Sequence, residues 1–417
     1  MIGEILNNYK ITKLSNGIRV ASEKIDHVNS FSLGFWINVG SRDEILKNNG
    51  ISHFLEHMFF KGTKKRSAKR ISEDIESLGG YLNAFTSKEH TCFYGRGMKK
   101  YLEKTFIVLS DMIQDSIFDE KELKKEAKVV IDELHDIEDS PEELIFDKFE
   151  TAIFKGNTLS MPIIGTENNV SNFSRDDLKN YISKNYNANN FYVIASGNID
   201  HDTLVKYTEK YLTGIKTSEN KKRKIFKKNL TKDNYTYKDI NQSHLIIGGT
   251  TFGYNNIDRA ASNVISNILG EGSSSRLFQS LREKNGIAYQ INTFMNSFYD
   301  ISSFGVYLST NEMSLKRARD IVLKEFEKIQ TKEISSKELK RTKEYIKGHI
   351  QMSMESTSNR MMRMGHSLLY FNKIKTLEES MAEIDAITAE DILKHSKILL
   401  NPNNVTSVLI SSNNLLN

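Results

Sequence analysis

Hydrophobic and polar positions along this chain follow two periodicities, and each predicts a kind of element. Residues 30–40, SFSLGFWINVG, alternate as a half-buried strand does. Residues 51–60 carry apolar side chains at helical spacing, and the stretch KRISEDIESLGG (69–80) indicates a helix ended by glycines. The next stretch, YLNAFTSKEHTCFYGRGM (81–98), predicts one or two strands. The first hundred residues therefore mix strands and helices.

Further elements follow the same two periodicities. The stretch KLSNGIRVA (13–21) places Asn-Gly between apolar runs, a signal for a hairpin. Residues 101–116 and 119–138 predict amphipathic helices, and residues 189–199 predict another strand.

The second half of the chain repeats the order of the first, in recognisable words. KELKKEAKVVIDEL begins at Lys121 and KELKRTKEYIKGHI at Lys337, while NANNFYVIASGNI near residue 187 is matched by NPNNVTSVLISS near residue 401. Such a duplication predicts two similar domains. We expect an α+β fold in which each domain is a mainly antiparallel sheet with helices on one face. The predicted domains are 1–215 and 233–417, joined by a basic linker at 216–232.

Composition narrows the function classes. The 417 residues include 58 Lys and Arg against 53 Asp and Glu, a formal charge of +5, so neither nucleic acid nor an anionic membrane is expected as the main partner. The one cysteine, Cys92, excludes an intrachain disulfide. No secretory signal or run of about 20 apolar residues is visible. A cytoplasmic location is the expectation.

The helix predicted at 51–60 carries unusual chemistry in an apolar context. His53, Glu56 and His57 are spaced i, i+3 and i+4, so they share one face. Two imidazoles one turn apart can bind one divalent ion, and Zn²⁺ prefers nitrogen ligands. A glutamate beside the metal can accept the proton of zinc-bound water as that water attacks a carbonyl. The order H-x-x-E-H is known among metallopeptidases.

A catalytic zinc usually has three protein ligands, so one more is needed. The predicted helix at 119–138 offers Glu126, Asp132, Glu133 and Glu138, of which the two glutamates at 126 and 133 are two turns apart on one face. The residues themselves leave the choice between these two open. In the second half, the matching positions are Asn263, Ser266 and Asn267, with His349 opposite Glu133, so that domain retains the frame without the cluster.

The flanking words extend the pattern to nearly the whole chain. They are HFLEHMFFKGT, LGGYLNAFTSKEHTCFY, EAKVVIDEL and, in the second half, LREKNGIAYQI. With these words the sequence resembles the inverted-motif zinc peptidases that include pitrilysin, insulin-degrading enzyme and the mitochondrial processing peptidase. Its length and single pair of domains resemble the short bacterial members, which work as paired chains.

The resemblance implies a role for each residue of the cluster. It implies one Zn²⁺ per chain, held by His53, His57 and Glu133, with Glu56 as the general base. It implies that Glu126 supports the site without binding the metal. The activity to expect is hydrolysis of unfolded peptides or short polypeptides by a zinc endopeptidase.

The resemblance also implies where the substrate binds. Asn83, Ala84 and Phe85 match an edge strand beside the metal, to which a peptide can add through main-chain hydrogen bonds. Arg282 and Tyr289 match an arginine and a tyrosine that the second domain offers to the substrate carbonyl. The two domains are expected to form a clamshell chamber. The expected assembly is a homodimer, with a heterodimer as the alternative.

Two other functions compete with this interpretation. The first is a non-catalytic assembly or partner subunit of a processing-peptidase-like complex, although relatives of that kind usually lose metal-site residues. The second is a binding module with a closed structural zinc, which needs a fourth protein ligand such as His90 or His135. Neither histidine belongs to the matched words.

Overall fold

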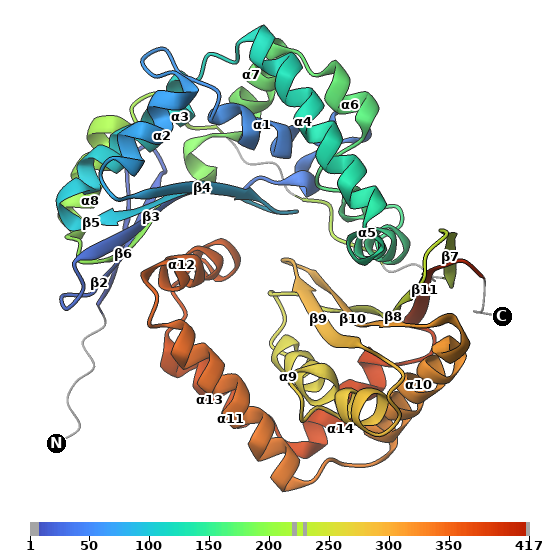
Figure 1. Ribbon diagram of the computed structural model, residues 1–417. Helices are drawn as coiled ribbons and strands as arrows, with labels where there is room; N and C mark the ends of the chain where they lie inside the picture. The colour runs from blue at the N-terminus through green and yellow to red at the C-terminus, as the bar shows by residue number, and fades with distance from the viewer. Residues whose placement is uncertain (1–7, 219–222, 228–231, 414–417) are drawn as a thin grey trace, which may run out of the picture. The chain divides into compact units, whose positions relative to one another are not determined.

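The computed structural model describes residues 8–218, 223–227 and 232–413. These residues form two compact units, each built around one sheet (Figure 1). The first unit contains the described residues up to Leu134 together with Met161–Arg223 and Ser353–Ile374. The second contains His135–Ser160, Lys224–Met352 and the chain from Lys375 onward. The predicted α+β class, with two similar domains, is confirmed.

The units exchange two segments, whereas the sequence predicts two continuous domains. His135–Ser160 precedes the linker and belongs to the second unit, and Ser353–Ile374 follows it and belongs to the first. The chain passes from the first unit to the second between Arg223 and Lys224, inside the predicted linker. The remaining linker positions 219–222 and 228–231 lie outside the described residues.

The sheet of the first unit has six strands in the order β1-β2-β6-β3-β5-β4. The strands are β1 Tyr9–Lys13, β2 Arg19–Lys24, β3 Ser30–Ile37, β4 Tyr81–Thr86, β5 Thr91–Met98 and β6 Phe191–Gly197. β2 and β6 are parallel and the other pairs antiparallel. The predicted hairpin at Asn-Gly joins β1 to β2. Among the strands that the structure describes, this order leaves one long side of β4 unpaired, at the edge of the sheet.

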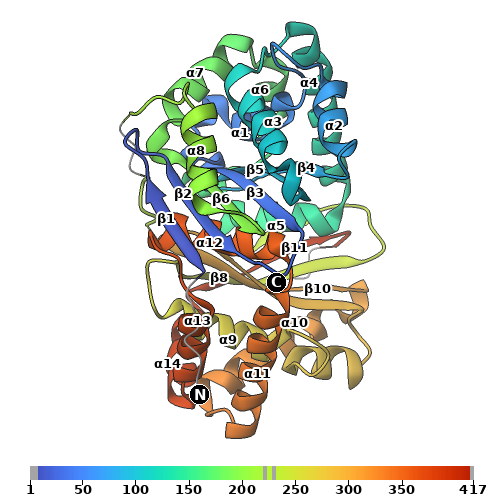
Figure 2. The same ribbon diagram turned by 90° about the vertical axis from the view of Figure 1, so that its left-hand side faces the viewer.

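Helices cover one face of this sheet (Figure 1). They are α1 Ile51–Phe59, α2 Ala68–Glu76, α3 Leu102–Asp115, α4 Glu120–Asp139, α6 Glu167–Asn172, α7 Arg175–Asn185 and α8 His201–Tyr211. Of these helices, α8 crosses the face near β2 (Figure 2). α12, Thr357–Phe371, lies on the opposite face against β3 and β6. β3 is therefore buried on both faces, although its alternation predicts burial of one.

The close packing of α12 on the sheet requires a glycine in the helix. The indole nitrogen of Trp36 on β3 donates to the sulfur of Met361 at 3.2 Å. A Cβ on Gly365 would lie 2.4 Å from the Trp36 ring, so the helix can approach this closely only without a side chain there. Trp36 is fully buried as a result.

The sheet of the second unit has five strands in the order β7-β11-β8-β10-β9. They are β7 Asn234–Tyr237, β8 Ser243–Phe252, β9 Gln290–Ser297, β10 Ile301–Thr310 and β11 Val405–Ser411. The helices are α5 Pro141–Ile153, α9 Arg259–Gly270, α10 Leu315–Thr331, α11 Ser336–Ser353, α13 Leu377–Ala386 and α14 Ala389–Leu399. Two cores result: α9, α10 and α14 pack on one face of the sheet, and α5 packs on the other against β8 and β11.

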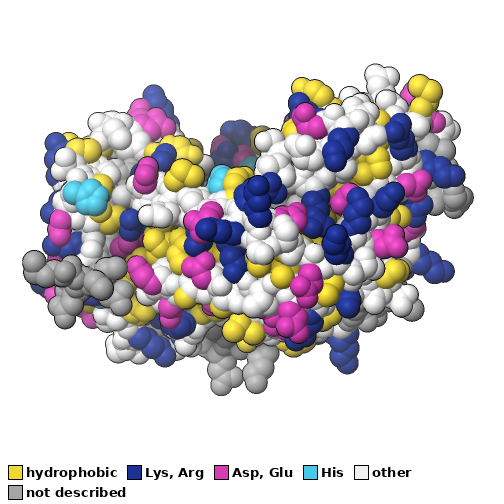
Figure 3. Space-filling view, turned by 90° about the horizontal axis from the view of Figure 1, so that it is seen from below, with side chains coloured by type: hydrophobic (Ala, Val, Ile, Leu, Met, Phe, Trp, Pro, Cys, Tyr) yellow, Lys and Arg dark blue, Asp and Glu magenta, His cyan; other side chains and the backbone are white. Residues whose placement is uncertain are grey.

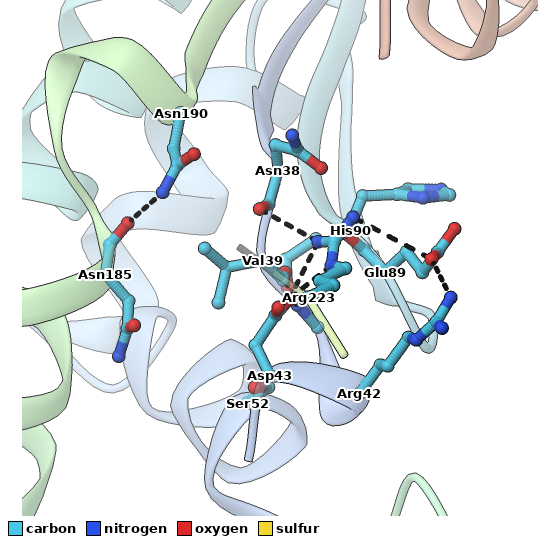
Figure 4. Close-up of polar contacts among 12 residues, drawn as sticks. Asn38, Val39, Arg42, Asp43, Ser52, Glu89, His90, Asn185, Asn190 and Arg223 are labelled. Atoms are coloured by element: carbon cyan, nitrogen blue, oxygen red, sulfur yellow. Dashed lines mark hydrogen bonds and ion pairs between the residues drawn. The ribbon is translucent and has the colours of Figure 1, made fainter. Parts of the chain in front are cut away.

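Arg223 ties the end of the first unit to its sheet. Its guanidinium binds both carboxylate oxygens of Asp43, at 2.9 and 2.8 Å, and donates to the backbone carbonyls of Asn38 and Glu89 (Figure 4). The Glu89 side chain pairs in turn with Arg42 at 2.6 Å, where both side chains are buried. Because the Arg223–Asp43 pair is bidentate, it fixes the orientation of the guanidinium as well as pairing the charges.

Charges of both signs are interspersed on the face shown in Figure 3. That distribution matches the near balance of 58 basic and 53 acidic residues. Within the part of the chain that the structure describes, no helix has the length and hydrophobicity needed to cross a membrane.

Candidate functional site

Helix α1 is amphipathic: one face packs in the core and the other carries polar side chains. Phe54, Leu55, Met58 and Phe59 are fully buried, and the Phe59 ring contacts Phe93 of β5 edge-on at 5.1 Å between centroids. The other face carries His53, Glu56 and His57, all partly buried. The apolar face therefore fixes the orientation in which the helix presents its polar side chains.

The N-terminus of α1 is held by a buried carboxylate. The N-cap position is Gly50, at φ +99°, where a Cβ would lie 2.7 Å from the Ile164 carbonyl oxygen. Glu44 supplies the missing acceptor: its oxygens lie 2.8 Å from the backbone nitrogens of Gly50 and Ser52. A negative charge is favourable at a helix N-terminus. Burial nevertheless raises the pKa of Glu44 to about 7.

Helix α4 brings two carboxylates to the histidines. Oε1 of Glu133 lies 3.7 Å from Nε2 of His53, and its Oε2 lies 3.6 Å from Nε2 of His57. Glu126 instead lies on the far side of the His57 ring, with its Oε1 2.8 Å from Nδ1 and its Oε2 2.6 Å from the ammonium of Lys61. The geometry thus separates the two glutamates that the residues alone left open.

The three facing groups suit a zinc ion. Ligand atoms of His53, His57 and Glu133 all lie within 4.8 Å of one another, and among the described residues these three form the group that could hold a metal ion. The 3.6 and 3.7 Å separations are too long for hydrogen bonds. They are close to the roughly 3.3 Å expected between tetrahedral ligands bound at 2.0–2.1 Å. The donor set, two imidazoles and one carboxylate, is one that catalytic zinc uses.

The hydrogen bond to Glu126 fixes which nitrogen of His57 is free. A carboxylate only accepts, so Nδ1 carries the proton and Nε2 presents its lone pair toward Glu133. Burial lowers the pKa of His57, but the hydrogen bond and charge of Glu126, with the charge of Glu133, outweigh it and raise that pKa. Burial, with the neighbouring His57, lowers the pKa of His53 to about 4. Neutral His53 is the form that binds a metal.

Glu56 joins α1 to the edge strand. Its Oε2 accepts from the Thr86 hydroxyl at 2.5 Å, at the end of β4. Burial raises the pKa of Glu56, whereas the Thr86 hydrogen bond and the charge of His57 oppose that rise. The carboxylate is therefore positioned beside both the histidines and the sheet edge.

The predicted substrate-binding residues lie on this same edge strand. The Asn83 amide donates to the Tyr81 hydroxyl at 2.6 Å, and its oxygen accepts from the backbone nitrogen of Ala84 at 2.8 Å. Phe85 packs edge-on against Trp36 at 5.7 Å between ring centroids. Phe85 thus has a packing role, whereas Asn83 and Ala84 present polar groups at the edge strand.

Arg282 and Tyr289 belong to the second unit. The structure brings these two together: the Arg282 guanidinium donates to the Tyr289 carbonyl at 3.3 Å and lies 5.4 Å from the centre of its ring. The Tyr289 side chain is exposed to 73%. Their role toward the substrate stays a prediction.

The two histidines considered as a fourth ligand of a closed zinc site, His90 and His135, have other surroundings. His90 is buried against Trp36 and His366, at 5.2 Å between ring centroids in each case, and burial lowers its pKa well below the usual value. His135 is exposed on α4. In the described residues, neither joins His53, His57 and Glu133 in the group that could hold a metal ion.

The second unit carries no such cluster at the matching positions. The Asn267 amide donates to the Asn263 carbonyl at 2.9 Å within α9, and the Ser266 carbonyl accepts from Thr293. The His349 ring on α11 packs against the Tyr345 ring at 4.3 Å between centroids, with the two ring planes tilted by 51°. The Asn267 amide and the His349 ring thus each make a contact within their own helix.

Three contacts at the site were missed by the sequence analysis: the Glu44 cap, the Thr86 hydroxyl and the Lys61 ammonium. Glu44 could have been found by asking what caps a helix whose N-cap is glycine. Thr86 and Lys61 contact residues of other elements, and the spacing of residues along the chain does not predict such contacts.

Comparison with known proteins decides the family. The model described as insulinase (peptidase family M16) matches residues 19–167, and that of the peptidase M16 inactive domain matches residues 172–346. The chain belongs to peptidase family M16. An uncharacterized zinc protease of Rickettsia bellii is 34% identical over 409 residues, covering 98% of each chain. The uncharacterized zinc protease YmxG of Bacillus subtilis is 36% identical over 411 residues, covering 96% of this chain and 98% of its own.

Solved structures show the same M16 fold. A protease from Helicobacter pylori superposes with a TM-score of 0.90 at 22% identity, covering 97% of this chain and all of the other. A protein from Pseudomonas fluorescens described as a peptidase M16 inactive domain superposes with a TM-score of 0.91 at 17% identity, covering 98% of this chain and 99% of the other. The family resemblance inferred from the sequence words is thereby confirmed.

Proposed function

We propose that this M16 chain is a zinc-dependent endopeptidase that hydrolyses unfolded peptides or short polypeptides. The observation that carries the proposal is the convergence of His53, His57 and Glu133, with ligand atoms within 4.8 Å of one another. Glu56 lies on the same face of α1 and is joined to the sheet edge through Thr86. The relatives named as zinc proteases support the same chemistry.

Each residue of the site has a distinct task. His53, His57 and Glu133 hold the ion, and Glu126 orients His57 by accepting from its Nδ1. Zinc, when bound, supplies Lewis acidity and lowers the pKa of water toward about 7. Glu56 accepts the proton of the attacking water and delivers it to the leaving amine nitrogen. One carboxylate thus serves as base and then as acid.

The substrate is proposed to bind as an extra strand on β4. β4 is the edge strand of its sheet, and its C-terminal residue Thr86 contacts Glu56. Main-chain hydrogen bonds to an edge require an extended segment and read little sequence, which favours unfolded peptides. The second unit is proposed to close a chamber in which Arg282 and Tyr289 contact the substrate, and the working assembly is proposed to be a homodimer in the cytoplasm.

A quenched fluorogenic peptide without stable structure tests the proposal. The zinc-loaded chain is expected to cleave it internally, a chelator to abolish cleavage, and added zinc to restore it. Glu56→Gln should retain zinc and lose at least a hundredfold in kcat, which is within the range for a general base. The control is Glu76→Gln, an exposed glutamate on α2.

A non-catalytic subunit is the competing function. It predicts no cleavage by the zinc-loaded wild-type chain, or equal cleavage by wild type and Glu56→Gln. Either result would end the proposal that Glu56 performs the chemistry.

A further inference from the structure

Arg96 and Tyr81 form a stacked pair beside the sheet edge. They are directly paired residues of β5 and β4 in the antiparallel register. The guanidinium carbon of Arg96 lies 4.7 Å from the centre of the Tyr81 ring. Arg96 is exposed, and Tyr81 is exposed to 40%. A guanidinium held over an aromatic ring has a fixed place while its edges stay available for a partner.

This pair lies on the sheet face opposite the helices. A Cβ on Gly95 would meet the Thr105 side chain of α3 at 2.6 Å, so Gly95 and its partner Leu82 face the helices. Because side chains alternate along strands, Tyr81 and Arg96 face the other way. The remaining side chains of β4 and β5 on that face are Asn83, Phe85, Cys92, Tyr94 and Met98. Arg96 is therefore the charged residue of this part of the face.

Arg96 lacks an acidic partner. By contrast, Arg66 of the same unit pairs with Asp74 at 2.9 Å and with Asp111 at 2.7 Å. Among the residues that the structure describes, no carboxylate lies within ion-pair distance of Arg96. Within the described ranges, its positive charge therefore has no carboxylate beside it.

Because of the stacking, the positive charge of Arg96 lies beside the edge strand β4. Arg96 is on β5, one strand in from the edge, but its guanidinium lies over Tyr81, which is on β4 itself. A strand added to β4 would run about 4.8 Å away from it. A substrate side chain on this face, beside Tyr81, would then meet the Arg96 guanidinium directly.

We propose that Arg96 makes the peptidase prefer substrates with an acidic side chain beside Tyr81. The inference rests on the proposed function, because it uses a peptide bound along β4. Tyr81 and Thr86 are the two ends of β4, five residues apart, and Thr86 contacts Glu56. At about 3.4 Å per residue, the acidic side chain lies about 17 Å from the position beside Thr86.

The chemistry of this subsite is an exposed ion pair. A carboxylate can accept two parallel hydrogen bonds from a guanidinium, whereas a lysine at the same position is repelled. Exposed pairs contribute little, so the expected preference for Asp over Lys is roughly twofold to fivefold. It should fall as ionic strength rises, since exposed charges are screened.

Peptide binding tests the inference separately from hydrolysis. Fluorescent unfolded peptides of one sequence carry a single Asp, or a single Lys, moved through each position in turn. Their affinities are measured by anisotropy with zinc-loaded Glu56→Gln, so that cleavage does not deplete the peptide. We expect the Asp peptide to bind more tightly than the Lys peptide when the charged residue is at one particular position. A smaller preference is expected two residues to either side, because those side chains share the same face. Arg96→Glu should invert that preference, and Arg96→Lys should retain it.

The control is Lys69→Glu, which makes the same change of charge at a side chain that is 85% exposed on α2. It should leave the Asp-to-Lys ratio as in wild type at every position. An Arg96→Glu ratio equal to that of wild type would overturn the inference, as would an equal change in Lys69→Glu. Loss of cleavage by the wild-type chain would instead overturn the proposed function, because the affinity ratios are measured without cleavage.

Discussion

Nδ1 of His57 lies 2.8 Å from Oε1 of Glu126, on the opposite side of the ring from Glu133. This contact fixes the tautomer of His57, and Lys61 holds the same carboxylate at 2.6 Å. Glu126→Gln should therefore weaken zinc binding by about 10- to 100-fold while leaving all three ligands in place. Competition with a chromophoric chelator measures the affinity.

The matched control is Glu120→Gln, at the exposed start of the same helix. It should bind zinc as the wild type does. Glu133→Ala should lose more affinity than Glu126→Gln, because it removes a ligand rather than a group that orients one. The reverse order would exchange the roles of the two glutamates.

Burial of Glu44 predicts a pH dependence of stability. Its pKa rises from 4.5 to about 7 on folding. Between these two values the unfolded chain has lost the proton and the folded chain retains it, so stability falls as pH rises. The loss approaches about 3 kcal/mol over the interval, from 1.36 kcal/mol per pH unit. Denaturant unfolding of the metal-free protein at pH 5, 6 and 7 measures it.

Glu44→Gln does not titrate and should remove this part of the pH dependence. The difference in unfolding free energy between wild type and Glu44→Gln should therefore change with pH. The stability of Glu76→Gln, a change at an exposed position of α2, should vary with pH in parallel with that of wild type. Parallel curves for Glu44→Gln as well would show that Glu44 has the same pKa in both states.

Close packing between Gly365 and Trp36 predicts a large effect of one methyl group. The added Cβ of Gly365→Ala would lie 2.4 Å from the Trp36 ring, and overpacking of this kind costs about 1–3 kcal/mol. The control is Gly348→Ala on α11, where a Cβ meets nothing within 4 Å. That change should stabilise the protein by about 0.5–1 kcal/mol. Thermal unfolding compares them, and equal shifts would contradict the contact.

Arg282 and Tyr289 are predicted to act on the substrate rather than on the metal. Arg282→Ala and Tyr289→Phe should each lower kcat/KM, by as much as the 100-fold typical of a lost oxyanion donor, with zinc content unchanged. Tyr237→Phe, a tyrosine of the second unit exposed to 66%, is the control and should cleave normally. If all three variants cleave as wild type does, these residues have no part in the reaction.

Much of the fold followed from local patterns. The hairpin at Asn-Gly, the helix with His53 and the helix with Glu133 form where spacing and turn residues predict them. The exchange of α5 and α12 between the units did not follow, because an amphipathic helix does not specify which sheet it will cover. The alternation of β3 likewise indicated one buried face, and only α12 explains the second.

The candidate site shows the same division. The i, i+3, i+4 spacing is enough to place His53, Glu56 and His57 on one face of α1. The residues of α4 left Glu126 and Glu133 as equals, because their difference lies in which side of the His57 ring each one meets. The roles of Asn83, Ala84 and Phe85 toward a substrate stay predictions.

The central claim is that His53, His57 and Glu133 together hold one zinc ion with a place left for water. X-ray absorption at the zinc edge of the loaded protein tests it directly. We expect one zinc per chain with two imidazole nitrogens and oxygen ligands at about 2.0–2.1 Å, and loss of the bound zinc in Glu133→Ala. A spectrum with a third imidazole or a sulfur ligand, or an unchanged spectrum in Glu133→Ala, would contradict the account.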